Sequence, residues 1–270
     1  PRVRRQRQMC IRDSSFGNGK AVRVSPDVKA QYVFSDSYVL YAKATGGRQL
    51  NDFRRLETYN PYLDPGQEVK DTYEQLNAGL GFKASPTPGL WFDIFGGYQN
   101  LKDDLYQSAA PWDGRDGANY IGLGQTHTDN FYAGIKASYE YKDLFAISAG
   151  GTYYHWNADA QTTGSKSSDY NEALLMKPEF DLGIHTEIHP IAALWLNAGY
   201  QYTRRAERYT GLYAKSIPAV SNLSLGATYR IFKGISAYVK ADNLLNKKYQ
   251  YYLYYPVEGI NFVGGLSFRF

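Results

Sequence analysis

The residues of this sequence best suited to chemistry are four histidines: His127, His155, His185 and His189. His185 and His189 flank Glu187 at a spacing of two, and side chains at that period point to the same side of a β-strand. Such a row could offer three ligands to a zinc ion. The row ends beside a short turn, where polar side chains are ordinarily solvated. We therefore expect a solvated rim at these residues and no metal site.

The sequence contains no recognisable catalytic motif. It has no nucleophile elbow, no phosphate-binding loop and no paired-carboxylate signature. His155 and Asp159 could serve a hydrolase at the rim of a barrel, but scattered histidines and aspartates are common. We therefore expect no enzyme activity and no cofactor. The single cysteine, Cys10, can form neither an internal disulfide nor a zinc ligand pair.

Aromatic residues are the best candidates for ligand contacts. The chain has 26 tyrosines, and aromatic residues make up 16% of it. Aromatic side chains bury a large area at a low entropic cost, and the tyrosine hydroxyl adds a polar contact, which suits capture of a small ligand. A membrane-interface girdle or packing between loops would use the same residues. The candidates are Trp112, Tyr120, Tyr251, Tyr252, Tyr254 and Tyr255, which fall in two long connections.

A repeated alternation predicts the elements that position these residues. From about Val28 onward, apolar or aromatic side chains alternate with polar ones over stretches of roughly eight to ten residues. No charged residue falls on the apolar side of any stretch, although 21% of the chain is charged. The alternation predicts an all-β protein with about eleven antiparallel strands. They lie near 24–34, 37–46, 73–84, 90–101, 126–141, 144–157, 172–188, 191–204, 219–232, 235–246 and 259–270.

The connections between these strands alternate between short and long. Turns such as Lys142-Asp143 and Lys233-Gly234 alternate with connections such as those near 46–72 and 100–128. Outer-membrane β-barrels have this arrangement, with short turns toward the periplasm and long loops outside. In hydrocarbon every backbone polar group needs a hydrogen-bond partner, which a closed sheet supplies. The face toward lipid must carry apolar side chains, whereas the face toward the lumen can carry polar ones. The pattern predicts an antiparallel transmembrane meander that forms part of a larger outer-membrane β-barrel.

Charge and hydropathy exclude two other classes. The chain has 30 basic and 26 acidic residues, a balance too even to indicate a nucleic-acid partner. It also contains no stretch of about 18 apolar residues, which a membrane-spanning helix would need. The sequence therefore predicts no nucleic-acid binding and no transmembrane helix.

The end of the chain resembles the end of a TonB-dependent outer-membrane receptor. The run Ala241-Asp242-Asn243-Leu244-Leu245-Asn246-Lys247-Lys248-Tyr249 is similar to that family's penultimate-strand motif. Tyr255-Pro256 and Gly259-Ile260-Asn261-Phe262 resemble the return into the last strand, although Ile260 stands where many members have arginine. Gly265 to Phe270 resembles the terminal strand. The match covers about 30 residues, and for Asn243 to Asn246 we expect mainly a polar turn that holds the strand exit.

The resemblance implies a receptor that takes up a scarce ligand: an iron–siderophore complex, haem, cobalamin or a glycan. Family members have a barrel of about 22 strands with a plugged lumen, and an N-terminal region that contacts the TonB complex. About eleven strands would be the C-terminal half of such a barrel, in contact with outer-membrane lipid. The resemblance also implies a signal for the barrel assembly machinery, carried here by Gly265, Leu266, Phe268 and Phe270.

The first residues differ from the rest. Residues 1–15 are rich in arginine, lack the apolar core of a signal peptide, and resemble the translation of a sequencing adaptor. We interpret them as a non-native leader and residues 20–270 as the barrel part. The missing export signal and the odd strand count predict that an N-terminal part, with the plug, is lacking. The alternative is a complete small outer-membrane barrel of the porin, adhesin or enzyme type, which an upstream plug domain would exclude.

Overall fold

The computed structural model describes residues 23–63, 66–108, 121–159, 172–206 and 217–269, together with the backbone of a strand at residues 5–12. Strands dominate these ranges. They are β1 (Arg5–Arg12), β2 (Ser25–Ser35), β3 (Tyr38–Gln49), β4 (Thr72–Thr87), β5 (Leu90–Ser108), β6 (Gly122–Tyr141), β7 (Phe145–Ala158), β8 (Pro178–Ile191), β9 (Leu194–Arg205), β10 (Val220–Phe232), β11 (Ile235–Asp242), β12 (Gln250–Tyr252), β13 (Tyr255–Pro256) and β14 (Asn261–Phe268). The helical elements are α1 (Phe53–Tyr59) and the 3-10 turn η1 (Glu172–Leu174).

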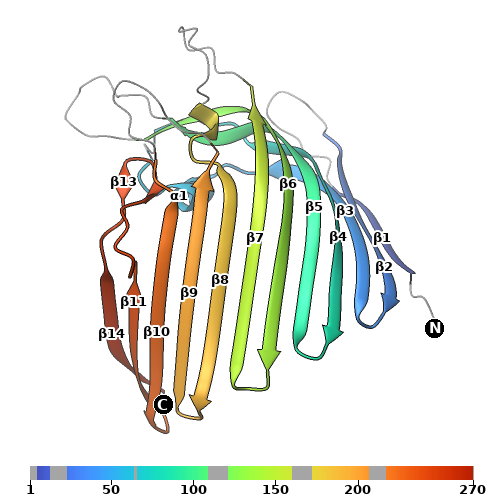
Figure 1. The fold of residues 1–270 in the computed structure, drawn as a ribbon. Coiled ribbons are helices and arrows are strands. Elements are labelled where there is room, and N and C mark those ends of the chain that lie inside the picture. Colours follow the sequence, from blue (N-terminus) through green and yellow to red (C-terminus); the bar gives the residue numbers. More distant parts are fainter. Residues whose placement is uncertain are drawn as a thin grey trace, which may run out of the picture.

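Twelve of the strands form one antiparallel meander. The strand order follows the chain from β1 to β11 and then β14, while β12 and β13 pair separately in the last long connection. Figure 1 shows the strands side by side in a curved wall, with tight turns along the lower edge and long connections along the upper edge. The ten strands β2 to β11, together with β14, confirm the predicted meander of eleven strands. In the described part of the chain, no helix is long and apolar enough to cross a bilayer.

The strand register places the predicted apolar side chains on one face of the wall. One cross-strand row runs from Leu40 to Phe82, Ile94 and Ile135, and three of these four are exposed large hydrophobic residues. A soluble sandwich would bury such a row, whereas a wall in lipid presents it outward. Alternation places several further large apolar residues on this outward face, where we expect them to be exposed. Leu225 and Phe268 are exposed, whereas the others are of intermediate exposure: Phe180, Leu182, Ile184 and Leu223.

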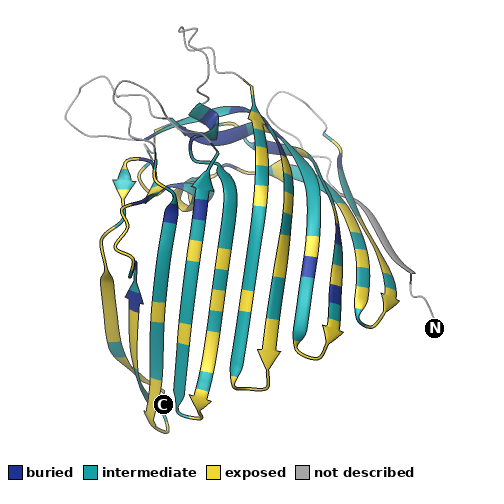
Figure 2. Ribbon diagram, in the orientation of Figure 1, coloured by how far each residue is buried: buried dark blue, intermediate teal, exposed yellow. Residues whose placement is uncertain are grey.

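Residues of the opposite, inner face are polar, aromatic or glycine, and few of them pack in a continuous core. Figure 2 shows intermediate or exposed residues along most of each strand, while the buried ones mostly gather toward the edge with the long connections. The core of this molecule therefore lies at its outer end and not between two sheets.

The structure corrects the predicted bounds at two places. Strands β5 and β6 run to Ser108 and from Gly122, beyond the predicted ends at 101 and 126. The eighth strand begins at Pro178, and the residues predicted to start it form η1 instead. At both places the chain packs against other long connections. Its residues are therefore buried by tertiary contacts, which a period-two alternation does not reveal.

The leader contributes the backbone of β1, which pairs with β2 from Arg5 opposite Tyr32 to Arg12 opposite Ser25. The sequence of the leader has no apolar side, in contrast to the eleven strands that follow it. The interpretation of residues 1–15 as a non-native leader stays a prediction.

Candidate functional site

The candidate site begins where the hairpin β5–β6 bends away from the wall. A register shift separates Leu101 from Asp104, and Asp103 between them has a left-handed backbone with φ of 55°. The Asp103 carbonyl accepts hydrogen bonds from Thr72 Oγ1 and Gln125 Nε2, both at 2.9 Å. Beyond this bend the strand is buried from Asp104 to Gln107. A bulge thus turns the hairpin over the upper opening of the wall, as Figure 1 shows.

The connection between β3 and β4 is closed at its base by polar contacts. Asp71 accepts from the Asn51 backbone N–H at 3.0 Å and from Arg48 Nε at 2.6 Å. Asn51 Nδ2 donates to the Lys70 carbonyl at 2.7 Å. Burial alone would raise the pKa of Asp71, but the bonds from Asn51 and Arg48 lower it below its usual value. Asp71 is therefore held as a carboxylate that fixes the start of this connection.

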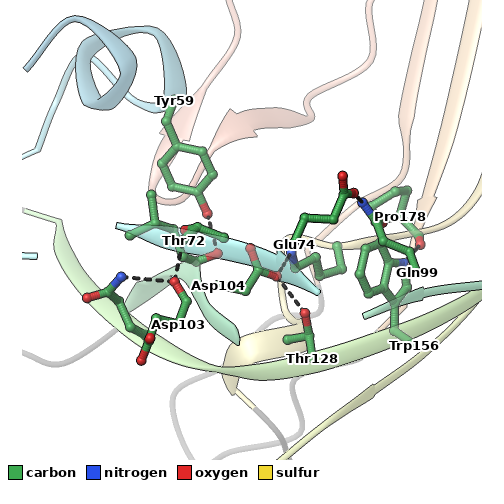
Figure 3. Close-up of polar contacts among 12 residues, drawn as sticks. Tyr59, Thr72, Glu74, Gln99, Asp103, Asp104, Thr128, Trp156 and Pro178 are labelled. Carbon is green, nitrogen blue, oxygen red and sulfur yellow. Dashed lines mark hydrogen bonds and ion pairs between the residues drawn. The ribbon is translucent and has the colours of Figure 1, made fainter. Parts of the chain in front are cut away.

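Helix α1 carries Tyr59 onto the bent hairpin. Asp52 caps the helix by accepting from the Arg55 backbone N–H at 2.9 Å. Tyr59 points from the helix toward β5, and its hydroxyl donates to the Leu105 carbonyl at 3.2 Å (Figure 3). Burial, and then the nearby Asp104 carboxylate, raise the pKa of Tyr59 far above its usual value. Tyr59 therefore acts as a neutral donor that joins the two connections.

A part-buried ion pair joins β5 to the segment before β8. Lys177 Nζ lies 2.5 Å from Asp104 Oδ2, and Thr128 Oγ1 donates to the same oxygen at 2.7 Å. The Lys177 ammonium also lies 4.6 Å from the centre of the Trp156 ring. Trp156 Nε1 in turn donates to the Pro178 carbonyl at 2.9 Å, so the indole supports the start of β8 (Figure 3).

Above these contacts lies a small hydrophobic core, which we call the outer cap. Ile121, Leu175 and Leu253 are each at most 2% exposed and pack together. They come from the connections β5–β6, β7–β8 and β11–β14. The partly buried residues that surround them are Leu63, Met176, Ile217 and Tyr255. Five outer connections therefore meet in one packed unit, in which Gln107 Oε1 accepts from Asn60 Nδ2 at 3.1 Å and from the Leu253 N–H at 2.9 Å.

The structure separates the predicted aromatic contact residues into groups. Tyr255 stacks on Tyr62 with ring centres 3.6 Å apart, and Tyr252 meets the same ring edge to face, so both belong to the packing of the outer cap. Tyr251 bonds Gln201 on the inner wall, with a separation of 3.3 Å from the hydroxyl to the side-chain oxygen, whereas Tyr254 is 56% exposed. Trp112 and Tyr120 lie outside the described residues. A role of these aromatics in ligand contact stays a prediction.

The end of the chain places its motif residues in a turn and a strand. Asn243 Nδ2 donates to the carbonyls of Lys247 and Glu258 at 3.0 and 2.8 Å, so its amide holds the strand exit, as the sequence predicts. In β14, Leu266 and Phe268 are exposed on the apolar face, and Gly265 lies under the ring of Tyr238. Phe270 lies outside the described residues. The role of these residues as an assembly signal stays a prediction.

The histidines do not converge. His185 Nε2 lies 3.1 Å from Glu187 Oε1, but His189 contacts the Asp143 carbonyl at 3.1 Å and packs its ring against Trp195. Among the described residues, no group of three His, Cys, Asp or Glu side chains is placed to hold a metal ion.

The inner wall carries fixed aromatic and charged side chains. The Tyr41 hydroxyl donates to both oxygens of Asp93, at 3.0 and 3.1 Å. Lys83 lies over the Tyr41 ring at 5.3 Å, and Lys136 over the Phe95 ring at 5.4 Å. Alternation in the sequence predicts which face of its strand each of these side chains occupies, but not its neighbours across strands. The wall beneath the outer cap is thus suited to polar contacts.

Comparisons with known proteins identify this architecture. No family model and no curated protein matches the sequence. Solved structures do match over most of the chain. The ferric-catecholate import receptor Fiu from K12 E. coli has 13% identity and a TM-score of 0.62, and covers 92% of this chain. The pyoverdine receptor FpvA from Pseudomonas aeruginosa PAO1 has 16% identity, a TM-score of 0.60 and 93% coverage.

A third match is the siderophore receptor PiuA from Acinetobacter baumannii, with 14% identity, a TM-score of 0.60 and 93% coverage. The chain spans only 35%, 36% and 38% of the length of Fiu, FpvA and PiuA. At such identities the likeness establishes the fold. The described chain therefore has the fold of part of the β-barrel of TonB-dependent outer-membrane receptors.

Proposed function

We propose that this chain forms part of the wall and outer mouth of a bacterial outer-membrane receptor that takes up a scarce ligand. The candidate ligands are an iron–siderophore complex, haem, cobalamin or a glycan. In this proposal the exposed apolar face contacts outer-membrane lipid, the polar face lines the lumen, and the outer cap meets the ligand first. Uptake is driven through the TonB complex, and the barrel assembly machinery inserts the wall.

One observation carries the proposal: one face of the wall is mainly apolar and the other mainly polar across the strands β2 to β11 and β14. The register pairs apolar positions on neighbouring strands, such as Leu40 with Phe82 in the β3–β4 pair and Ile235 with Phe268 in the β11–β14 pair. An aqueous protein with such an exposed face would aggregate, whereas lipid covers it without cost. The likeness to barrels of transport receptors supports the same role.

The rival function, a complete small barrel, is disfavoured by the strand pairing. A closed barrel needs its first and last strands to pair, because closure removes the edges. The sheet order is linear, and among the described strands neither β1 nor β2 pairs with β14. The matched receptors are also far longer than this chain, so we assign the activity to a protein with further strands and a plug.

The placement of the faces can be tested by spin labels on β6. In a cysteine-free background of the full-length protein that carries this sequence, purified in detergent micelles, single cysteines that carry a spin label replace consecutive residues from Phe131 to Ser138. Collisions with oxygen should be frequent at Phe131, Ala133 and Ile135, and collisions with a water-soluble nickel complex frequent at the positions between them. Equal accessibility to both reagents along the strand would contradict the proposal.

The ligand requires a separate test. Growth of the host with and without the gene that carries this sequence would be compared, with each candidate ligand as the only source of its nutrient. Loss of growth on one ligand alone would assign it. Unchanged growth on all four would contradict the uptake function while leaving the wall assignment intact.

A further inference from the structure

An open hollow of about 790 Å³ lies at the edge of the wall with the short turns, which we call the short-turn edge. It is found at the turn between β10 and β11, next to the end of β14, at the lower edge of the wall in Figure 1. Three cationic side chains line it: Arg230, Lys233 and Arg269. The hollow therefore gathers positive charge at the end of the molecule opposite the outer cap.

Arg230 is held in place by the indole of Trp195. Its guanidinium carbon lies 5.0 Å from the centre of the Trp195 ring, and the guanidinium donates to the Ala192 carbonyl. An arginine stacked on an aromatic ring can still offer its planar fork of N–H donors to a carboxylate or a phosphate. Because the stacking already restricts the side chain, an anion that binds here orders it at a lower entropic cost than a freely moving arginine.

Lys233 and Arg269 come from two segments that meet at the short-turn edge. The Arg269 backbone N–H donates to the Gly234 carbonyl at 2.8 Å, which ties the end of β14 to the turn that carries Lys233. All three cations are exposed, and none forms an ion pair with a described residue. No acidic side chain is among the described residues that line the hollow. An anion bound there would therefore offset a concentration of like charge.

The hollow also has an apolar border. Ile231 and Phe232, at the end of β10, line it and are 41% and 69% exposed. Ser236 and Ser267, in contrast, line it as cross-strand partners in the inner-face row that contains Arg230. Residues of both faces of the wall thus meet at this hollow. Cations and hydroxyls next to an exposed apolar surface suit an amphipathic anion.

We propose that this hollow binds the headgroup of an anionic phospholipid in the periplasmic leaflet of the outer membrane. The cations Arg230, Lys233 and Arg269 bind the phosphate oxygens, and the acyl chains extend along the apolar face beside Phe232. Basic pockets at a membrane surface recognise anionic lipid headgroups through the same chemistry. An acidic peptide would match the charge but would leave the exposed Ile231 and Phe232 uncovered. The inference rests on the proposed function, because that function places the short-turn edge at the periplasmic surface of the bilayer.

The test uses the full-length protein that carries this sequence, purified in micelles of an uncharged detergent. Phosphatidylglycerol and phosphatidylcholine with the same acyl chains are added in equal amounts, and native mass spectrometry counts the lipid molecules that stay bound. We expect phosphatidylglycerol to be retained preferentially. Arg230→Gln should weaken its binding about tenfold, as for loss of a hydrogen bond to a charged group. Lys233→Gln, which changes an exposed turn side chain and leaves the stacked arginine intact, should weaken it as well.

Lys142→Gln is the matched control. Lys142 lies in the turn between β6 and β7 at the same edge, and its ammonium is 5.2 Å from the centre of the Tyr141 ring, much as Arg230 lies over Trp195. It does not line the hollow, so binding of phosphatidylglycerol should not change in this variant. Phe232→Ala keeps every charge and should weaken binding of phosphatidylglycerol, because its acyl chains lose an apolar contact.

Equal retention of the two lipids would overturn the proposal. Equal losses in Lys233→Gln and Lys142→Gln would also overturn it, because they would show only a general attraction of the edge for anions. Stronger displacement of phosphatidylglycerol by hexaglutamate than by glycerol 1-phosphate would assign the hollow to an acidic protein segment. A protein with the expected spin-label pattern on β6 and no preference for phosphatidylglycerol would lose this site alone. A protein without that pattern would lose the proposed wall, and with it the orientation on which this site depends.

Discussion

The ring of Tyr41 lies across Gly81 on the neighbouring strand. The two residues are direct partners in the β3–β4 pairing, and a Cβ atom built on Gly81 would fall 2.4 Å from the tyrosine ring. The relationship recurs on the inner face. Phe95 lies in the same way over Gly134, and Tyr132 over Gly97. Aromatic rings thus cover cross-strand glycines, which fixes the rings flat against the wall.

Replacement of Gly81 by alanine should displace Tyr41 and break its bonds to Asp93. We expect a loss in free energy of unfolding of about 1–3 kcal/mol, as for overpacking in a tight site. The measurement is urea unfolding in detergent micelles. The matched control is Gly183→Ala on β8, because nothing lies within 4 Å of a Cβ there. Equal losses in both variants would show that only strand propensity is involved.

The ion pair of Asp104 and Lys177 gives a second prediction. Lys177→Met leaves a buried carboxylate without its cation and should cost about 3–5 kcal/mol. The double variant Asp104→Asn with Lys177→Met should recover most of that loss, because no unpaired charge remains. The same urea unfolding measurement applies. If the loss in the double variant equals the sum of the losses in Asp104→Asn and in Lys177→Met, the two side chains do not interact.

The sequence predicted the wall well and the outer cap hardly at all. Alternation along each strand is a local property, so it located eleven strands and the apolar face from Leu40 to Phe268. The outer cap depends on contacts between residues far apart, such as Gln107 with Leu253. No local period reports such a contact, and for this reason α1 and the bent end of β5–β6 were not foreseen.

In the candidate site, too, single residues could be predicted from the sequence but their distant contacts could not. The sequence indicates Tyr252 and Tyr255 as ligand-contact candidates because they are tyrosines in a long loop. Their packing partner Tyr62 lies in a different connection, so no local pattern predicts the contact. The covering of inner-face glycines by aromatic rings was missed because its signal lies across strands. Gly81 and Tyr41 become meaningful only once the register sets them side by side. An abundance of inward glycines in a tyrosine-rich chain was the available hint.

Gln107 should hold two outer connections together. Gln107→Ala removes the acceptor of the Asn60 amide and of the Leu253 N–H, so both donors are left buried without a partner. We expect faster hydrogen exchange in peptides from residues 50–63 and 247–257, by roughly tenfold for a loss of about 1–3 kcal/mol. Exchange in β9 should not change. Gln75→Ala, at an exposed position on β4, serves as the control, and exchange that rises equally in both variants would contradict a specific link.

Acid should release the β3–β4 connection through Asp71. Its pKa in the folded protein lies below the usual value of 3.8, so the carboxylate contributes stability that is present above that value. As the pH falls through the lowered pKa, protonation removes the acceptor for Asn51 and Arg48, and this stability is lost. Hydrogen exchange of residues 48–63 in micelles should therefore accelerate below about pH 4 relative to the wall strands. In Asp71→Asn the same segment should exchange faster at pH 6 and show a weaker acid response. An acid response of unchanged size in that variant would assign the effect to another carboxylate.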